Sequence, residues 1–118
     1  MATRSYINTI QKAKSLGYDI TLVFFWLDSV ELAIKRVKIR VEEGGHNIPT
    51  DVIKRRYFAG LQNLFQLYIK ETSYWMIFNN STLPSELIAE GYGNEEIHIQ
   101  NKRTFEIIKK ISQDDSRE

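Results

Sequence analysis

Arginines within one segment are the residues with the clearest chemical potential. Residues 35–56 hold seven of the sixteen Lys and Arg side chains, among them Arg36, Arg40, Arg55 and Arg56. The guanidinium group stays charged and binds phosphate oxygens in bidentate fashion. The loop Gly-Gly-His-Asn-Ile-Pro at 44–49 would let the flanking helices fold back, so the four groups could converge over one cleft. The alternative is that these side chains only solvate exposed helix faces.

Apolar periodicity and capping residues predict the elements that must position these arginines. We expect helices over 3–16, from Asp28 or Ser29 to the glycines at 44–45, from a Thr50 cap to about residue 70, and from an Asn101 cap to residue 111. Apolar runs rich in β-branched and aromatic residues predict strands, covered on both faces, from Ile20 to Leu27 and over 74–79. Segments 86–92 and 95–100 suggest a small hairpin.

This order of elements predicts a single α/β domain over residues 1–118, with a polar tail at 112–118. Two central parallel strands make a poor sheet, because α/β domains normally contain more. We therefore expect a homodimer, or a partner polypeptide that supplies further strands along the edge from Ile20 to Leu27.

Composition excludes several classes of protein. The 118 residues carry a net charge of +1, which disfavours nucleic-acid binding. The chain has no cysteine and only two histidines, His46 and His98, so we expect no protein-held metal. The apolar run from Leu22 to Leu27 is too short to cross a membrane, and no signal peptide is evident, which together favour a cytoplasmic location. Neither G-x-x-x-x-G-K-[S/T] nor G-x-G-x-x-G occurs.

Several segments resemble the zeta-toxin-like family of P-loop kinases. They include Phe-Trp-Leu-Asp-Ser at 25–29, Glu-Leu-Ala-Ile-Lys-Arg-Val at 31–37, Gly-Gly-His-Asn-Ile-Pro at 44–49 and Ile-Lys-Arg-Arg-Tyr at 53–57. The resemblance implies a layered parallel sheet of the P-loop nucleotide kinase type. It also implies truncation at the N-terminus, because the P-loop strand and helix of the family have no counterpart here.

The same resemblance implies roles for individual residues. Arg40, Arg55 and Arg56 would be catalytic and neutralise charge on the phosphoryl group in transit, a device of phosphoryl transfer. Arg36, His46 and Asn47 would bind substrate. ATP and Mg²⁺ would be the cofactors of the complete enzyme, but this chain alone would hold neither. Zeta toxins act in toxin–antitoxin systems and phosphorylate a UDP-linked amino sugar.

Two functional hypotheses follow. In the first, the chain is the lid and phosphate-arginine portion of an ATP-dependent small-molecule kinase, inactive alone because the P-loop and general base are missing. In the second, it is a non-catalytic interaction module or degenerate remnant that binds a protein partner or a phosphate-bearing ligand.

Overall fold

The computed structural model describes residues 6–93 and 95–113 and contains the expected helices and strands, with ends displaced by a few residues. Residues 1–5, 94 and 114–118, which include parts of the expected first helix, hairpin turn and tail, lie outside the described residues. The elements are α1 (Tyr6–Ser15), β1 (Thr21–Trp26), α2 (Val30–Glu42), α3 (Thr50–Asn63), η1 (Leu64–Tyr68), α4 (Ile69–Glu71), β2 (Tyr74–Asn79), β3 (Glu86–Tyr92), β4 (Glu96–Ile99) and α5 (Lys102–Gln113).

The four strands form one mixed sheet in the order β1-β2-β3-β4. Only β1 and β2 are parallel, whereas β3 and β4 continue the sheet in antiparallel fashion. The expected layered parallel sheet of the P-loop nucleotide kinase type is therefore wrong. Residues 80–85 are too few for the crossover that a further parallel strand requires, so β3 turns back beside β2. The expected hairpin consequently belongs to the main sheet.

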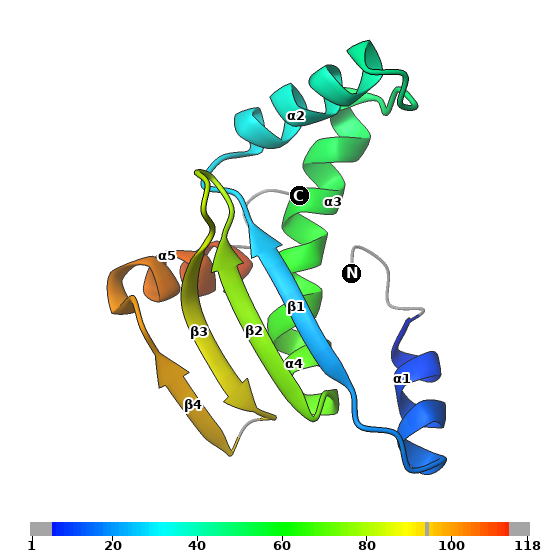
Figure 1. Cartoon of the computed structure of the whole chain (residues 1–118), viewed down its shortest axis with the longest axis vertical. Helices are drawn as coiled ribbons and strands as arrows, with labels where there is room; N and C mark the ends of the chain where they lie inside the picture. Colours follow the sequence, from blue (N-terminus) through cyan, green and yellow to red (C-terminus); the bar gives the residue numbers. More distant parts are fainter. Residues whose placement is uncertain (1–5, 94, 114–118) are drawn as a thin grey trace.

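All the helices that pack on the sheet lie on one of its faces. Figure 1 shows α3, α4 and α5 behind the strands, with α2 extending from the carboxyl end of β1. The core between these layers contains Trp26, Leu61, Leu64, Ile69, Trp75, Ile77, Ile88, Ala89, Phe105 and Ile108. The indole N–H of Trp75, whose side chain is the largest of the fully buried ones described, donates a 2.9 Å hydrogen bond to the carbonyl oxygen of Gly93.

The opposite face of the sheet is covered by none of the described helices (Figure 1). We call this surface, formed by Val23, Phe25, Tyr74, Phe78 and Tyr92, the open face. Phe25 is 56% exposed and Val23 41%. The expectation that the first strand is covered on both faces is therefore wrong for the described part of the chain.

Two of the expected helix caps are present. Ser29 Oγ accepts a 3.1 Å hydrogen bond from the N–H of Leu32, and Asn101 Oδ1 accepts a 3.1 Å bond from the N–H of Thr104. The third helix begins differently: its N-cap is Pro49 rather than Thr50, without a side-chain cap bond. The last helix, α5, continues through Gln113 and so includes the first two residues of the expected tail.

Candidate functional site

Arg36 lies where the parallel strands β1 and β2 end. Its Nη2 donates a 3.1 Å hydrogen bond to the carbonyl oxygen of Ser81, in the connection after β2. Ser81 Oγ accepts a 2.9 Å bond from the N–H of Asp28, and its N–H donates to Asn79 Oδ1 at 3.0 Å. These contacts tie α2 to the ends of both strands. One donor group of Arg36 is thereby used to position the protein's own backbone.

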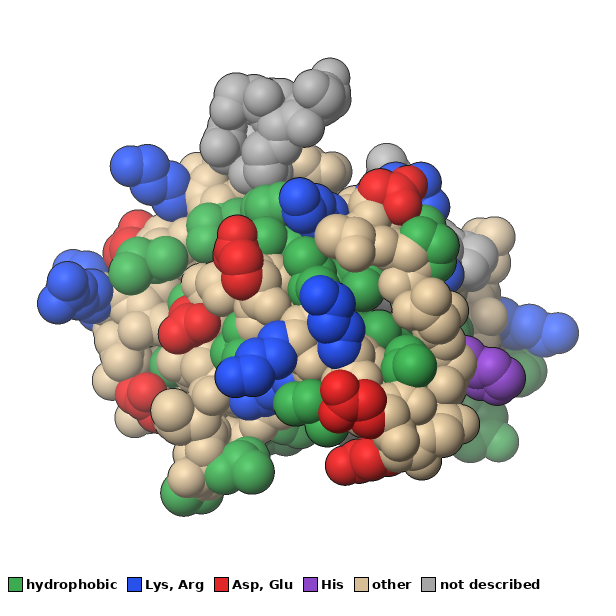
Figure 2. All heavy atoms as spheres, turned by 90° about the horizontal axis from the view of Figure 1, so that it is seen from above, with side chains coloured by type: hydrophobic (Ala, Val, Ile, Leu, Met, Phe, Trp, Pro, Cys, Tyr) green, Lys and Arg blue, Asp and Glu red, His purple; other side chains and the backbone are tan. Residues whose placement is uncertain are grey.

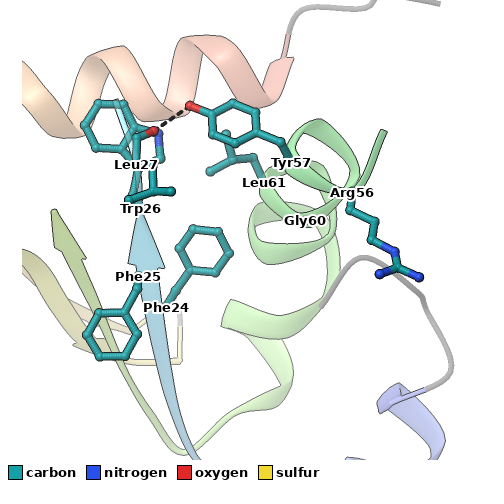
Figure 3. A pocket seen from close by; sticks show the side chains of 8 residues that line it. All are labelled: Phe24, Phe25, Trp26, Leu27, Arg56, Tyr57, Gly60 and Leu61. Atoms are coloured by element: carbon teal, nitrogen blue, oxygen red, sulfur yellow. Dashed lines mark hydrogen bonds between the residues drawn. The ribbon is translucent and has the colours of Figure 1, made fainter. Parts of the chain in front are cut away.

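The other predicted arginines are exposed on the two helices of a hairpin. Arg40 is in the last turn of α2, and Arg55 and Arg56 are in α3, which packs against α2. His46 and Asn47 are exposed in the connecting loop. Figure 3 shows the guanidinium group of Arg56 directed away from β1. Within the described part of the chain, no hydrogen bond or ion pair joins Arg40, Arg55 or Arg56 to another side chain, so their convergence on an anion stays a prediction.

The surface around these helices is mixed in charge. Figure 2, which views the molecule from the α2 end, shows basic side chains interspersed with acidic and hydrophobic ones. Among residues 6–93 and 95–113, no group of three or more His, Asp or Glu side chains is arranged to hold a metal ion. Within the same ranges, no helix combines the length and the apolar character needed to cross a membrane.

The backbone of β1 offers a different kind of site. The carbonyl oxygens of Ile20 and Trp26 accept hydrogen bonds from residues on the β2 side, at 3.1 Å from Tyr74 and 2.7 Å from Asn80. Because alternate residues of a strand direct their N–H and C=O groups to opposite sides, the groups of Thr21, Val23 and Phe25 point away from β2. Since β1 ends the sheet, we call these groups the outer edge of β1.

The outer edge of β1 is closed at its carboxyl end by a side chain. The hydroxyl of Tyr57 donates a 2.6 Å hydrogen bond to the carbonyl oxygen of Leu27, the next outward-facing residue (Figure 3). Among the described residues, no comparable hydrogen bond reaches the outward groups of Thr21, Val23 or Phe25. An unprotected edge strand of this kind is a template for pairing with another chain.

Two cavities lie on the helix side of β1. The α3 cavity, of about 170 Å³, is lined by Phe24, Phe25 and Trp26 of β1, by Leu27 directly after it, and by Arg56, Tyr57, Gly60 and Leu61 of α3. Figure 3 shows Phe24 directed from β1 toward α3 and Phe25 directed to the opposite side of the strand. The indole N–H of Trp26 is buried without a partner in the described part of the chain, which is a costly state.

The α1 cavity, of about 330 Å³, lies at the other end of β1. It is lined by Tyr6, Thr9, Ile10, Ile20, Thr21, Leu22, Tyr68 and Thr72. Neither cavity is lined by a residue of β2, so β1 is the only one of the four strands that both cavities adjoin. The sequence predicts an associating edge in this position, but it does not reveal the Tyr57 bond or the cavities, because these depend on how α1 and α3 sit beside the strand.

Comparisons with known proteins yield one relative. An uncharacterized protein of Haemophilus influenzae (strain ATCC 51907 / DSM 11121 / KW20 / Rd) is 35% identical over 57 residues, which are 48% of this chain and 41% of that protein. The match thus spans less than half of the relative's length. No family model matches the chain. No solved structure matches it either.

Proposed function

We propose that this chain is a non-catalytic interaction module that binds an extended segment of another polypeptide along the outer edge of β1. The observation that supports the proposal is the strand itself. It is apolar from Leu22 to Trp26, it ends the sheet, and it directs the backbone groups of Thr21, Val23 and Phe25 away from β2. Addition of a strand to such an edge is a common mode of peptide recognition, in which main-chain hydrogen bonds supply affinity.

The side chains of β1 support the same function. Edge strands of monomeric proteins are usually guarded by charge, proline, a bulge or a covering segment. Thr21–Trp26 contains no charged residue and no proline. Its ring Phe25 is stacked on Phe78 with centroids 5.7 Å apart, and together the two rings extend an apolar surface to the strand's edge. A strand added there would bury apolar area on both sides of the sheet.

The test is a titration of the full chain with a synthetic probe that carries a fluorescent label. The probe is a nine-residue peptide of alternating Thr and apolar residues, with two leucines four positions apart and a lysine at each end. A matched peptide is N-methylated on alternate amides, so that it cannot donate to β1. We expect the methylated peptide to bind ~10-fold more weakly or worse, a difference of about 1.4 kcal/mol. Equal binding of the two peptides overturns the proposal.

A pair of matched variants places the binding on β1. Val23→Lys puts a charge on β1, on the open face, at a side chain that is 41% exposed, and Ile99→Lys puts a charge on β4 at the far edge, on the face toward the helices, where the side chain is 42% exposed. We expect Val23→Lys to weaken binding of the probe and Ile99→Lys to leave it unchanged. If Ile99→Lys has the larger effect, β4 is the binding edge and the proposal fails.

The phosphotransferase portion implied by the family resemblance is a second candidate. It is favoured by the position of Arg36 beside the carboxyl ends of two parallel strands, which is where α/β sheets commonly bind ligands. Replacing Arg55 and Arg56 together with Ala, and measuring inorganic pyrophosphate binding by calorimetry, tests it. Unchanged binding removes the arginines from this role.

A cytoplasmic location stays a prediction.

A further inference from the structure

We infer that the segment bound along β1 is recognised by two apolar side chains four residues apart, one in the α1 cavity and one in the α3 cavity. This inference rests on the proposed strand addition and specifies its ligand: an extended partner segment with the pattern apolar-x-x-x-apolar on the side that faces the helices. The pattern follows from where the cavities lie along β1.

The spacing of the cavities matches the spacing of side chains on a strand. Leu22 lines the α1 cavity and Trp26 lines the α3 cavity. These residues are four positions apart on one side of β1, a separation of about 13 Å at ~3.3 Å per residue. A strand paired with β1 follows the same repeat, so two of its helix-side residues four positions apart reach both cavities.

The cavity linings determine the chemistry of the side chains. Apart from Arg56, whose charged group points away from β1, the α3 cavity is formed by apolar and aromatic residues and Gly60. The α1 cavity adds Thr9, Thr21 and Thr72 to an otherwise apolar and aromatic lining. Charged side chains would lose their hydration in either place without a partner of opposite charge. We therefore assign leucine-sized or larger apolar side chains to both positions.

The partner segment is a foreign one rather than the β1 strand of a second copy of this chain. Leu22, Phe24 and Trp26 are the helix-side residues of β1, and all three already pack in or against the core of their own copy. A second β1 would thus bring side chains that are committed to its own α3 and could not enter the cavities beside the first.

A double-mutant cycle tests the inference. A Cβ added at Gly60 would lie 3.9 Å from Phe24 Cε2, an ordinary contact, so Gly60→Ala is tolerated and narrows the α3 cavity. With the unaltered chain, replacing the matching leucine of the probe by Ala should weaken binding ~10-fold. With Gly60→Ala, the same replacement should cost less than ~3-fold, because the two changes share one cavity.

The outcomes separate this inference from the function on which it rests. If backbone methylation and Val23→Lys abolish binding but the leucine and Gly60 show no coupling, strand addition stands and the cavity assignment is overturned. If methylation has no effect, the proposed function itself fails. Sedimentation velocity of the chain alone gives a further test. If the chain forms a dimer that Val23→Lys dissociates, a second copy occupies the outer edge of β1, and the inference of a foreign segment is overturned.

Discussion

The hydroxyl of Tyr57, on α3, donates a 2.6 Å hydrogen bond to the carbonyl oxygen of Leu27, the residue that follows β1. This bond joins α3 to the outer side of β1. It satisfies the carbonyl oxygen of Leu27, which points away from β2 directly after the strand ends. It therefore marks where the available part of that edge ends.

Tyr57→Phe removes this bond while keeping the ring. We expect the free energy of unfolding to fall by about 1 kcal/mol, the usual net contribution of a hydrogen bond. Urea denaturation followed by tryptophan fluorescence measures it. Tyr18→Phe is the control, because Tyr18 is 66% exposed and should tolerate the loss of its hydroxyl. Equal effects of the two variants would contradict a stabilising role for the Tyr57 bond.

Gly91→Ala should destabilise the sheet. A Cβ at Gly91 would lie 2.6 Å from the carbonyl oxygen of Glu96 and 2.8 Å from Cζ2 of Trp75, so either β4 or the core ring must move. We expect a loss of ~1–3 kcal/mol, as for overpacked cores. Gly60→Ala, without such a clash, should instead raise stability by up to ~1 kcal/mol through helix propensity. Thermal unfolding of both variants compares them, and a neutral Gly91→Ala would be inconsistent with the close packing.

Arg36→Ala should destabilise the protein more than Arg40→Ala does. Arg36 Nη2 donates a 3.1 Å hydrogen bond to the carbonyl oxygen of Ser81. Its removal should lower the free energy of unfolding by ~1.5–3 kcal/mol, the range for hydrogen bonds that involve a charged group. Arg40 is exposed, and its removal should change stability by no more than ~0.5 kcal/mol. Guanidinium denaturation of the two variants gives the comparison. A larger loss from Arg40→Ala would mean that the structural roles of the two arginines are reversed.

The phenol of Tyr74 should lose its proton at a higher pH than an ordinary tyrosine does. Its hydroxyl donates a 2.7 Å hydrogen bond to Glu90 Oε1, and this bond, followed by desolvation and the nearby charge of Glu90, raises the pKa of Tyr74 above 10.0. The folded protein thus holds this proton more tightly than the unfolded chain does. The resulting stability is fully present below pH 10.0 and is lost as the pH rises through the raised pKa.

Alkaline titration of the tyrosinate absorbance measures this shift. Glu90→Gln should return the pKa of Tyr74 toward its ordinary value. Glu96→Gln, which alters the carboxylate 3.5 Å from His98, should leave it raised. If the Glu90→Gln variant titrates like the unaltered protein, Glu90 is not the cause of the raised pKa.

The local elements could be predicted because their signals are local. The strand over 74–79 is predicted to the residue, and the Ser29 and Asn101 caps are found where expected, since caps and periodicity act within a few positions. The apolar residues that recur at three- and four-residue spacing along the third helix lie on its inner side: Ile53, Leu61, Leu64 and Tyr68 are buried.

The arrangement of the strands could not be predicted in the same way. A run of apolar residues is typical both of a parallel strand covered on two faces and of an edge strand such as β1. Only the position of the strand in the folded sheet distinguishes the two cases. The short connection 80–85 was the one available signal that β3 must run antiparallel to β2. The candidate site is similar: the spacing of Arg36 and Arg40 on one helix could not show that Arg36 is bonded to Ser81, a residue 45 positions away.

The pairing of β1 with β2 also bears on the order in which the chain acquires structure. Ile20 and Ser73, whose hydrogen bond begins this pairing, are 53 residues apart, whereas β2, β3 and β4 are joined by short turns. Closing the longer loop costs more chain entropy before any contact compensates for it. During synthesis, β1 leaves the ribosome before β2, so its apolar side chains and unpaired backbone groups stay open to chaperones until β2 follows.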